Sequence, residues 1–415
     1  MTLKKALQAL LILFVLLIAI GLWPFWMDTA QGATTPVELS YSQPGPYPVG
    51  IRTLVLGEEA PYALTVWYPS SAAASGEDYL YEYAIKLSLP SENSTVGLAA
   101  FAGAAQFDAA FEDADGPYPL IVLSPGFALG ASTHGWLAEH IASYGFVVVA
   151  PEHREHLNNA FTELSQATVV RPQDIASLFT LLAELAEPGP EFAGFYDLDN
   201  AALVGHSYGG YTALVSGGAR LYPAAFEQTC ATARATEDPS AWLCDVLLPY
   251  VPDMAELAGL PRDFEGLWPD WRQPEVDAIV ALAGDAFMMG AEGLQSIQVP
   301  VLAIGGTEDK DSPYLWSTSP TYEFASSEHK ARVGLLGVGH MIFAGPCERV
   351  SLLVNVAAGE FCNDPGLERQ LAHDVTSHFT TAFLLAELQQ DAQAASAMGG
   401  DYRAIEQISY DASGY

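Results

Sequence analysis

A serine flanked by glycines is the most reactive position that the sequence offers. Residues 205–209 read Gly-His-Ser-Tyr-Gly, a match to Gly-x-Ser-x-Gly, and Gly210 adds another small residue. An apolar strand-like run precedes the motif and a helical pattern follows it. A sharp turn between strand and helix lifts a serine hydroxyl above a sheet, and the glycines let strand and helix approach closely. We therefore predict Ser207 as a nucleophile; the alternative is a glycine-rich turn that merely contains serine.

A serine hydroxyl becomes a good nucleophile when a histidine takes its proton and an acid orients that histidine. In one common arrangement the chain order is Ser, acid, His. His340 ends the run Gly-Val-Gly-His directly after the last expected strand. The other histidines precede the serine, lie beside it, or lack this strand-then-glycine setting. His340 is therefore the predicted base.

Two segments compete to supply the acid. Residues 305–313, Gly-Gly-Thr-Glu-Asp-Lys-Asp-Ser-Pro, follow the penultimate expected strand. Asp309 is the preferred acid there, with Asp311 and Glu308 as near neighbours. Asp285, after the preceding strand, is the rival.

A tetrahedral intermediate also needs two backbone amides aimed at its oxyanion. The amide of Tyr208, directly after the nucleophile, is one predicted donor. The second is expected from residues 124–130, Ser-Pro-Gly-Phe-Ala-Leu-Gly, a loop after the first core strand. Phe127 is the preferred donor there and Ala128 the alternative, and the Phe127 side chain would line the acyl side of the pocket. The Pro-Gly pair could equally serve a simple tight turn.

The elements that position these residues alternate along the chain. Continuous apolar runs predict strands buried on both faces, and apolar residues at three- and four-residue steps predict amphipathic helices. The expected strands are 118–123, 146–150, 201–204, 278–282, 299–304 and 333–336, and the expected helices are 136–144, 175–185, 208–216 and 367–388. This alternation predicts an α/β fold with a mostly parallel central sheet and helices on both faces.

Other segments interrupt the alternation of strands and helices in the domain, which we expect to span residues 34–390. Residues 217–275 are rich in Pro, Asp and Trp and are predicted to form an inserted cap above the sheet. Residues 71–116 are expected to carry short helices, and 391–415 to form a flexible tail. Candidate pocket residues, for which ordinary core packing is an equal alternative, are Phe127, Phe287, Met288 and Met289.

Residues 1–33 have the pattern of an export segment. Lys4 and Lys5 precede an apolar run over 6–26, which as a helix would span roughly 31 Å, enough to cross a bilayer. Small residues allow cleavage before Ala33. A cleaved signal peptide and a retained membrane anchor both remain open, and either places the rest of the chain outside the cytoplasm.

Cysteine spacing and charge agree with export. Four cysteines allow three pairings, and the short separations favour Cys230 with Cys244 and Cys347 with Cys362. No metal-binding spacing accompanies them, so no metal site is predicted. Lys and Arg total 16 against 50 Asp and Glu, a formal charge of −34. Such a surface repels phosphate backbones, which excludes nucleic-acid binding.

Taken together, residues 123–126, residues 205–210, residues 305–313 and residues 337–340 resemble an α/β-hydrolase. Residues 150–154, Ala-Pro-Glu-His-Arg, and 171–174, Arg-Pro-Gln-Asp, resemble the type II platelet-activating-factor acetylhydrolases and the exported dienelactone-hydrolase-like esterases. The resemblance covers roughly residues 50–385. It implies the nucleophile role for Ser207 and the base role for His340. The acid would correspond to Asp285 in the first group and to Asp309 in the second.

The sequence thus predicts an exported serine hydrolase that cleaves a carboxylic ester through Ser207, His340 and Asp309, with no cofactor. One alternative is a phospholipase A2-like lipid esterase of the acetylhydrolase type. Another is a catalytically silent fold acting as an extracellular binding protein. The expected partner is a small-molecule or lipid ester, with membrane attachment through residues 1–33 left open, as are the identity of the ester and the oligomeric state.

Overall fold

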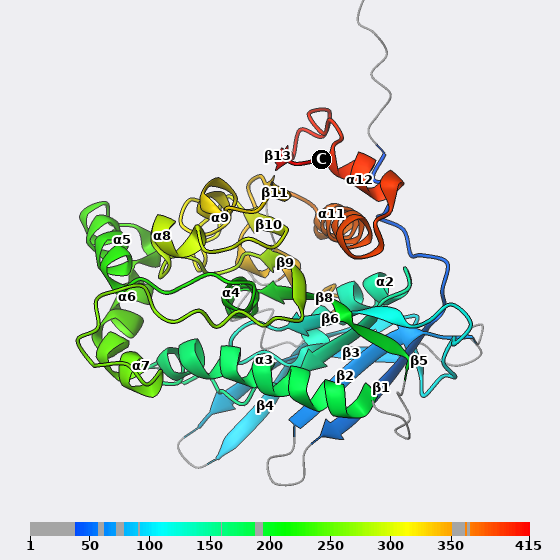
Figure 1. The fold of residues 1–415 in the computed structure, drawn as a ribbon, viewed down its shortest axis with the longest axis horizontal. Coiled ribbons are helices and arrows are strands. Elements are labelled where there is room, and N and C mark those ends of the chain that lie inside the picture. Colours follow the sequence, from blue (N-terminus) through cyan, green and yellow to red (C-terminus); the bar gives the residue numbers. More distant parts are fainter. Residues whose placement is uncertain are drawn as a thin grey trace, which may run out of the picture. The chain divides into compact units, whose positions relative to one another are not determined.

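The computed structural model describes residues 38–56, 62–71, 79–89, 92–158, 160–186, 194–350, 362 and 366–415. The core of the fold is a ten-stranded sheet. Its strand order is β13-β11-β10-β9-β8-β6-β7-β2-β1-β5 (Figure 1). The strands are β1 (Val49–Leu56), β2 (Tyr62–Pro69), β5 (Gln106–Phe107), β6 (Tyr118–Ser124), β7 (Val147–Pro151), β8 (Tyr196–His206), β9 (Val276–Leu282), β10 (Val301–Gly306), β11 (Lys330–Leu335) and β13 (Ile408–Ser413). The predicted α/β fold with a mostly parallel sheet is confirmed.

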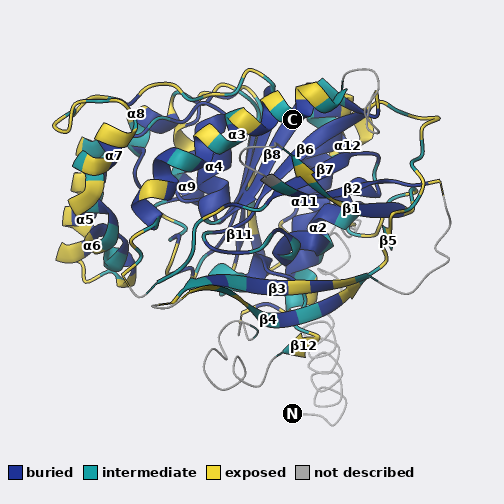
Figure 2. Cartoon of the chain, turned by 90° about the horizontal axis from the view of Figure 1, so that it is seen from below, coloured by how far each residue is buried: buried dark blue, intermediate teal, exposed yellow. Residues whose placement is uncertain are grey.

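The six central strands, β6 to β11, run parallel, whereas β2 and β13 join them antiparallel. Every residue of β6, β7 and β10 is buried. This explains why these strands read as continuous apolar runs, since helices cover both of their faces. Figure 2 shows the central strands in the colour of buried residues, with exposed residues on the outer helices, on loops and on β3 (Tyr79–Ser88) and β4 (Asn93–Gly103).

Helices cover the sheet on two sides. On one face α4 (Tyr208–Ser216) packs against β6, β8 and β9, and α3 (Leu164–Ala186) packs on α4. On the other, α2 (Gly135–Ala142) contacts β2 and β7, and α11 (Arg369–Gln389) contacts β8, β9 and β10. α2 and α11 lie above the sheet in Figure 1, and α3 lies below it. Short helices α8 (Gly290–Leu294) and α9 (Thr318–Phe324) precede β10 and β11.

Two expectations about the periphery are wrong. Within the described part of residues 71–116 the chain forms strands rather than helices: β3 (Tyr79–Ser88) and β4 (Asn93–Gly103) pair antiparallel, and β12 (Arg349–Val350) pairs with β4. The segment expected as a flexible tail instead forms α12 (Ala392–Met398) and β13, which pairs with β11 as the edge strand of the main sheet.

Residues 217–275, the segment predicted as a cap, lie between α4 and β9 and are mainly helical. They hold α5 (Pro223–Ala235), α6 (Trp242–Leu247), α7 (Val251–Leu257) and the 3-10 turns η2 (Pro239–Ala241) and η3 (Leu248–Tyr250). The disulfide Cys230–Cys244 joins α5 to α6, and Cys347–Cys362 is the second disulfide. The two local pairings favoured by the sequence are confirmed.

The export segment predicted at residues 1–33 lies outside the described residues. Within the described ranges, no helix combines the length and the apolar character that a membrane crossing requires.

Candidate active site

Ser207 lies on a strained turn between β8 and α4. Its backbone has φ 58° and ψ −122°, a region that non-glycine residues rarely adopt. The glycines around it are required by close backbone approach, because a Cβ at Gly205 would lie 2.1 Å from the carbonyl oxygen of Gly209. A Cβ at Gly209 would lie 1.9 Å from that of Ser124. The local sequence therefore folds into the turn that the motif predicts.

The predicted nucleophile, base and acid lie in one hydrogen-bonded chain. His340 Nε2 lies 2.7 Å from Ser207 Oγ, and His340 Nδ1 lies 2.8 Å from Asp309 Oδ2. The other oxygen of Asp309, Oδ1, accepts the amides of Asp311 at 2.9 Å and Ser312 at 2.8 Å. These bonds fix the carboxylate, which in turn fixes the orientation of the imidazole.

The charge state of His340 is set by acids around it. Burial disfavours the imidazolium, but the carboxylate of Asp309, reinforced by Asp311 and Asp285, outweighs burial and raises the pKa of His340 to about 9. Once deprotonated, a group with this pKa is a strong base that can take a hydroxyl proton.

Asp285, the rival acid, does not contact the histidine. It is buried and accepts a hydrogen bond from Ser312 Oγ, and its own amide donates to the carbonyl of Ser207 at 3.4 Å. Burial raises the pKa of Asp285 to about 7, although the Ser312 hydrogen bond and His340 oppose the shift. The structure thus brings Asp309, and not Asp285, to His340.

The loop that carries His340 is held by residues that the sequence analysis did not single out. Arg369, at the start of α11, donates to the carbonyls of Met341 at 2.7 Å and Ile342 at 3.2 Å. Trp136, from α2, donates its indole N–H to the carbonyl of Phe343 at 3.1 Å. Both come from helices far away in the sequence, and no local motif marks them.

The two segments predicted to carry the oxyanion donors both lie beside Ser207. Tyr208 is the first residue of α4, directly after the serine. In loop 124–130, the Ala128 amide donates to Glu155 Oε1 at 3.3 Å and is therefore engaged. Within the described residues no hydrogen bond involves the amide of Phe127, which remains the preferred second donor.

Ser207 opens onto a cavity of about 270 Å³ with a mostly apolar lining. Its walls come from loop 124–130, from β3, from the segment before α3 and from α6, through residues that include Phe127, Tyr83, Ile85, Phe161, Trp242 and Leu243. Phe287, Met288 and Met289 do not line this cavity but pack in the core on the α3–α4 side. Of the four candidate pocket residues, only Phe127 lines this cavity.

Among the described residues, one group could offer several ligand atoms to a metal ion. These are Asp309, Asp311 and His340, whose ligand atoms lie within 4.8 Å of one another. A cation bound through His340 Nδ1 would need the electron pair that holds the proton donated to Asp309, so it would break that hydrogen bond. The donor set therefore fits a hydrogen-bonded chain better than a metal site.

Comparison with known proteins agrees with this fold. Residues 109–219 match the protein-family model described as Chlorophyllase, a stretch that runs from just before β6 to just after α4 and so includes loop 124–130 and Ser207. No curated protein matches the chain. The match supports the superfamily expected from the sequence and not the finer resemblance to acetylhydrolases or dienelactone-hydrolase-like esterases. The mostly parallel sheet gives the chain an α/β fold, and over residues 109–219 the chain is similar to the chlorophyllase family of α/β-hydrolases.

Proposed function

We propose that the protein is an exported serine hydrolase that cleaves carboxylic esters through an acyl-enzyme. The observation that carries the proposal is the hydrogen-bonded chain from Asp309 through His340 to Ser207 Oγ, at the wall of an apolar cavity. The match to the Chlorophyllase model supports ester cleavage within the superfamily.

In the first half-reaction, Ser207 Oγ attacks the ester carbonyl carbon while His340 Nε2 takes the hydroxyl proton. The carbonyl oxygen becomes an oxyanion, which the amides of Phe127 and Tyr208 stabilise by hydrogen bonds. When the tetrahedral intermediate collapses, the carbon–oxygen bond to the alcohol breaks and His340 returns the proton to the leaving oxygen. Asp309 keeps the imidazole in the required tautomer throughout.

In the second half-reaction, water attacks the acyl-enzyme. His340 takes a proton from this water and then returns it to Ser207 Oγ, which releases the carboxylic acid. No metal ion or organic cofactor is needed for either step.

The cavity suggests a neutral ester with an apolar acyl or alcohol group. Aromatic side chains from three parts of the chain, Tyr83, Phe127 and Trp242, contribute to its walls. Apolar walls bind apolar substituents through burial of their surface. The walls therefore define a slot for a hydrocarbon group beside Ser207.

Export is supported by the two disulfides, because such bonds persist in oxidising compartments. The apolar run near the N-terminus adds a sequence reason for the same location.

The experiment is hydrolysis of p-nitrophenyl esters from acetate to palmitate by the full chain and by its Ser207→Ala variant. We expect serine-dependent turnover with a maximum at short or medium acyl chains. A fluorophosphonate probe should label the wild type and not the variant. A wild type that is folded yet neither turns over nor labels would refute the proposal and favour an extracellular binding protein.

The same panel tests the lipid alternative. A phospholipid with a short acyl group at the second position is added as a further substrate. A higher kcat/KM for this lipid than for any p-nitrophenyl ester would favour the phospholipase A2-like enzyme over a general esterase.

A further inference from the structure

We propose that Arg171 and Glu155 position the oxyanion-binding amide of Phe127 by holding the backbone of loop 124–130 from behind. The proposal rests on the ester-hydrolase function proposed above and adds two positioning residues to it. Neither side chain lines the cavity beside Ser207, so both act through the loop.

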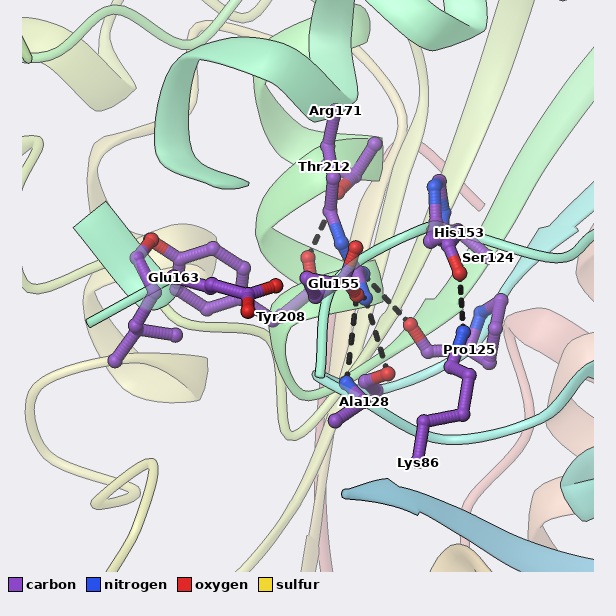
Figure 3. Close-up of polar contacts among 12 residues, drawn as sticks. Lys86, Ser124, Pro125, Ala128, His153, Glu155, Glu163, Arg171, Tyr208 and Thr212 are labelled. Carbon is purple, nitrogen blue, oxygen red and sulfur yellow. Dashed lines mark hydrogen bonds and ion pairs between the residues drawn. The ribbon is translucent and has the colours of Figure 1, made fainter. Parts of the chain in front are cut away.

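Arg171 fixes two successive carbonyl groups of the loop. Its side chain lies on α3 with a relative exposure of 1%. Nη1 donates to the carbonyl of Pro125 at 2.7 Å and Nη2 donates to that of Gly126 at 3.0 Å (Figure 3). A guanidinium is planar and rigid, so two bonds from one fork fix direction as well as distance. The loop cannot rotate these peptides without breaking a buried hydrogen bond.

The peptide bond between Gly126 and Phe127 carries this constraint to the cavity. In a trans peptide the C=O and the N–H point in opposite directions. Since the Gly126 carbonyl faces Arg171, the Phe127 N–H faces away from it, on the side where Gly126 and Phe127 line the cavity with Ser207. The loop is close to the nucleophile there, because a Cβ at Gly126 would lie 3.5 Å from that of Ser207.

Glu155 completes the arrangement. Its Oε1 pairs with Arg171 Nη2 and accepts the Ala128 amide at 3.3 Å. Ala128 has φ 57°, a conformation that needs such support in a residue other than glycine. Burial raises the pKa of Glu155, but Arg171 outweighs burial and holds that pKa well below its usual value, so the carboxylate stays charged. The Ala128 amide is thereby turned to Glu155, which leaves Phe127 as the loop's donor.

A gain in folding stability is a weak explanation for the buried ion pair between Arg171 and Glu155. A buried ion pair loses hydration that its mutual attraction roughly offsets, so its contribution to folding is small. The guanidinium also lies 5.7 Å from the ring centre of Tyr208, the residue that supplies the other oxyanion amide. Arg171 therefore contacts both donor segments of the proposed site.

The test compares Arg171→Lys and Glu155→Gln with the control Arg220→Lys. Lysine keeps the charge and loses the fork, and glutamine keeps an acceptor and loses the charge. Arg220 makes a similar fork in a different place, to the carbonyls of Trp268 at 2.5 Å and Leu267 at 3.2 Å. The readouts are kcat and KM for a short p-nitrophenyl ester, the Ki of a trifluoromethyl ketone that forms a tetrahedral adduct, and the melting temperature.

We expect kcat to fall about 10- to 100-fold in both variants, since a misdirected donor loses part of the effect of a missing one. KM should change by less than about twofold, because the ground-state carbonyl depends little on these amides. The Ki of the ketone should rise by the same factor by which kcat/KM falls. The control Arg220→Lys should keep the wild-type values.

If the Arg171→Lys and Glu155→Gln proteins fold and keep the wild-type kcat and the wild-type Ki of the ketone, the positioning role is overturned. An equal loss in Arg220→Lys would also overturn it, since the effect would then be one of general stability. If one variant fails to fold, the other decides, because each breaks a different contact with the loop. Absence of serine-dependent turnover in the wild type would instead refute the ester-hydrolase function, so the two failures are distinguishable.

Discussion

Two opposing effects act on the pKa of His340. Burial favours its neutral form, whereas the nearby carboxylates, Asp309 above all, favour the charged form and prevail. The free enzyme is then protonated at this position near neutral pH. In the proposed mechanism a protonated imidazole cannot accept the hydroxyl proton of Ser207, so the pKa of His340 would set the pH range of activity.

The first prediction concerns this pH dependence. Because the pKa of His340 is raised to about 9, kcat/KM should fall as the pH drops below that value, by about tenfold per pH unit. Initial rates on a short p-nitrophenyl ester between pH 5 and 10 measure it. Rates of Ser207→Ala are subtracted, because these esters hydrolyse on their own in base. A half-maximal point near pH 6.5 would contradict the prediction.

The second prediction separates the two candidate acids. Asp309→Asn removes the carboxylate bonded to His340 Nδ1, so kcat/KM should fall by about 10³- to 10⁴-fold. Asp285→Asn keeps an acceptor for Ser312 and breaks no contact with the histidine, so its cost should stay within about tenfold. Steady-state kinetics of both variants at one pH gives the comparison. A larger loss in Asp285→Asn than in Asp309→Asn would assign the acid to Asp285.

At the scale of single residues, the sequence predicted the candidate site residues that local motifs mark. It missed the residues that reach the site only through tertiary packing. Ser207, His340 and Asp309 each follow a strand with glycine nearby, which makes them recognisable. Arg369 and Trp136 reach the His340 loop from helices remote in the sequence. Their side chains bond to backbone carbonyls, and such contacts leave no pattern that a single sequence displays.

At the scale of elements, the tight junction of β8, α4 and loop 124–130 is the feature on which the site depends. The predicted bounds of α4 agree with the structure because its N-terminus is fixed by the serine turn. A side-chain hydrogen bond also links α3 to α4. Pro172 lacks an N–H, so the carbonyl of Thr168 does not receive the usual helical hydrogen bond. That carbonyl accepts the Tyr211 hydroxyl at 2.8 Å.

The third prediction tests this junction with Gly209→Ala. The new methyl group would meet the carbonyl oxygen of Ser124 at 1.9 Å, and backbone must move to relieve the clash. We expect a loss of about 1–3 kcal/mol in the free energy of unfolding, measured by urea denaturation. Activity should fall as well, because the oxyanion loop shifts relative to Ser207.

Gly266→Ala is the control for this prediction. Gly266 is exposed, and its Cβ would meet the edge of the Phe264 ring at 3.1 Å, which a side-chain rotation relieves. A Gly209→Ala protein as stable and as active as this control would show that the junction tolerates expansion.

The elements that the sequence missed lie at the periphery. Ala and acidic residues in 71–116 suggested helices, but Tyr79, Tyr81 and Tyr83 alternate with period two, and the sheet of β3, β4 and β12 uses this alternation. β13 has a short, polar sequence, because it lies at the edge of the main sheet and has little to bury. Edge strands of this kind are specified by pairing with β11 and not by their own hydrophobic pattern.

At the scale of the whole molecule, net charge acts on every approaching substrate. The chain has 50 acidic against 16 basic residues. Among the described residues that line the cavity, Asp285 and Asp311 are acidic and none is lysine or arginine. In the reactive form of the enzyme, in which His340 is neutral, both the surface and the cavity therefore disfavour anions, although over different distances. Salt screens the long-range part of this repulsion and leaves the short-range part in the cavity largely unchanged.

The fourth prediction uses a matched pair of esters, p-nitrophenyl butyrate and the mono-p-nitrophenyl ester of succinate, which adds a carboxylate at similar chain length. At 10 mM NaCl, kcat/KM for the anion should be lower by about tenfold or more. At 500 mM NaCl the ratio should narrow, because the Debye length falls from about 30 Å to below 8 Å. The ratio that persists at high salt then measures the cavity alone. A preference for the anion, or a ratio insensitive to salt, would contradict control of substrate choice by the protein's overall field.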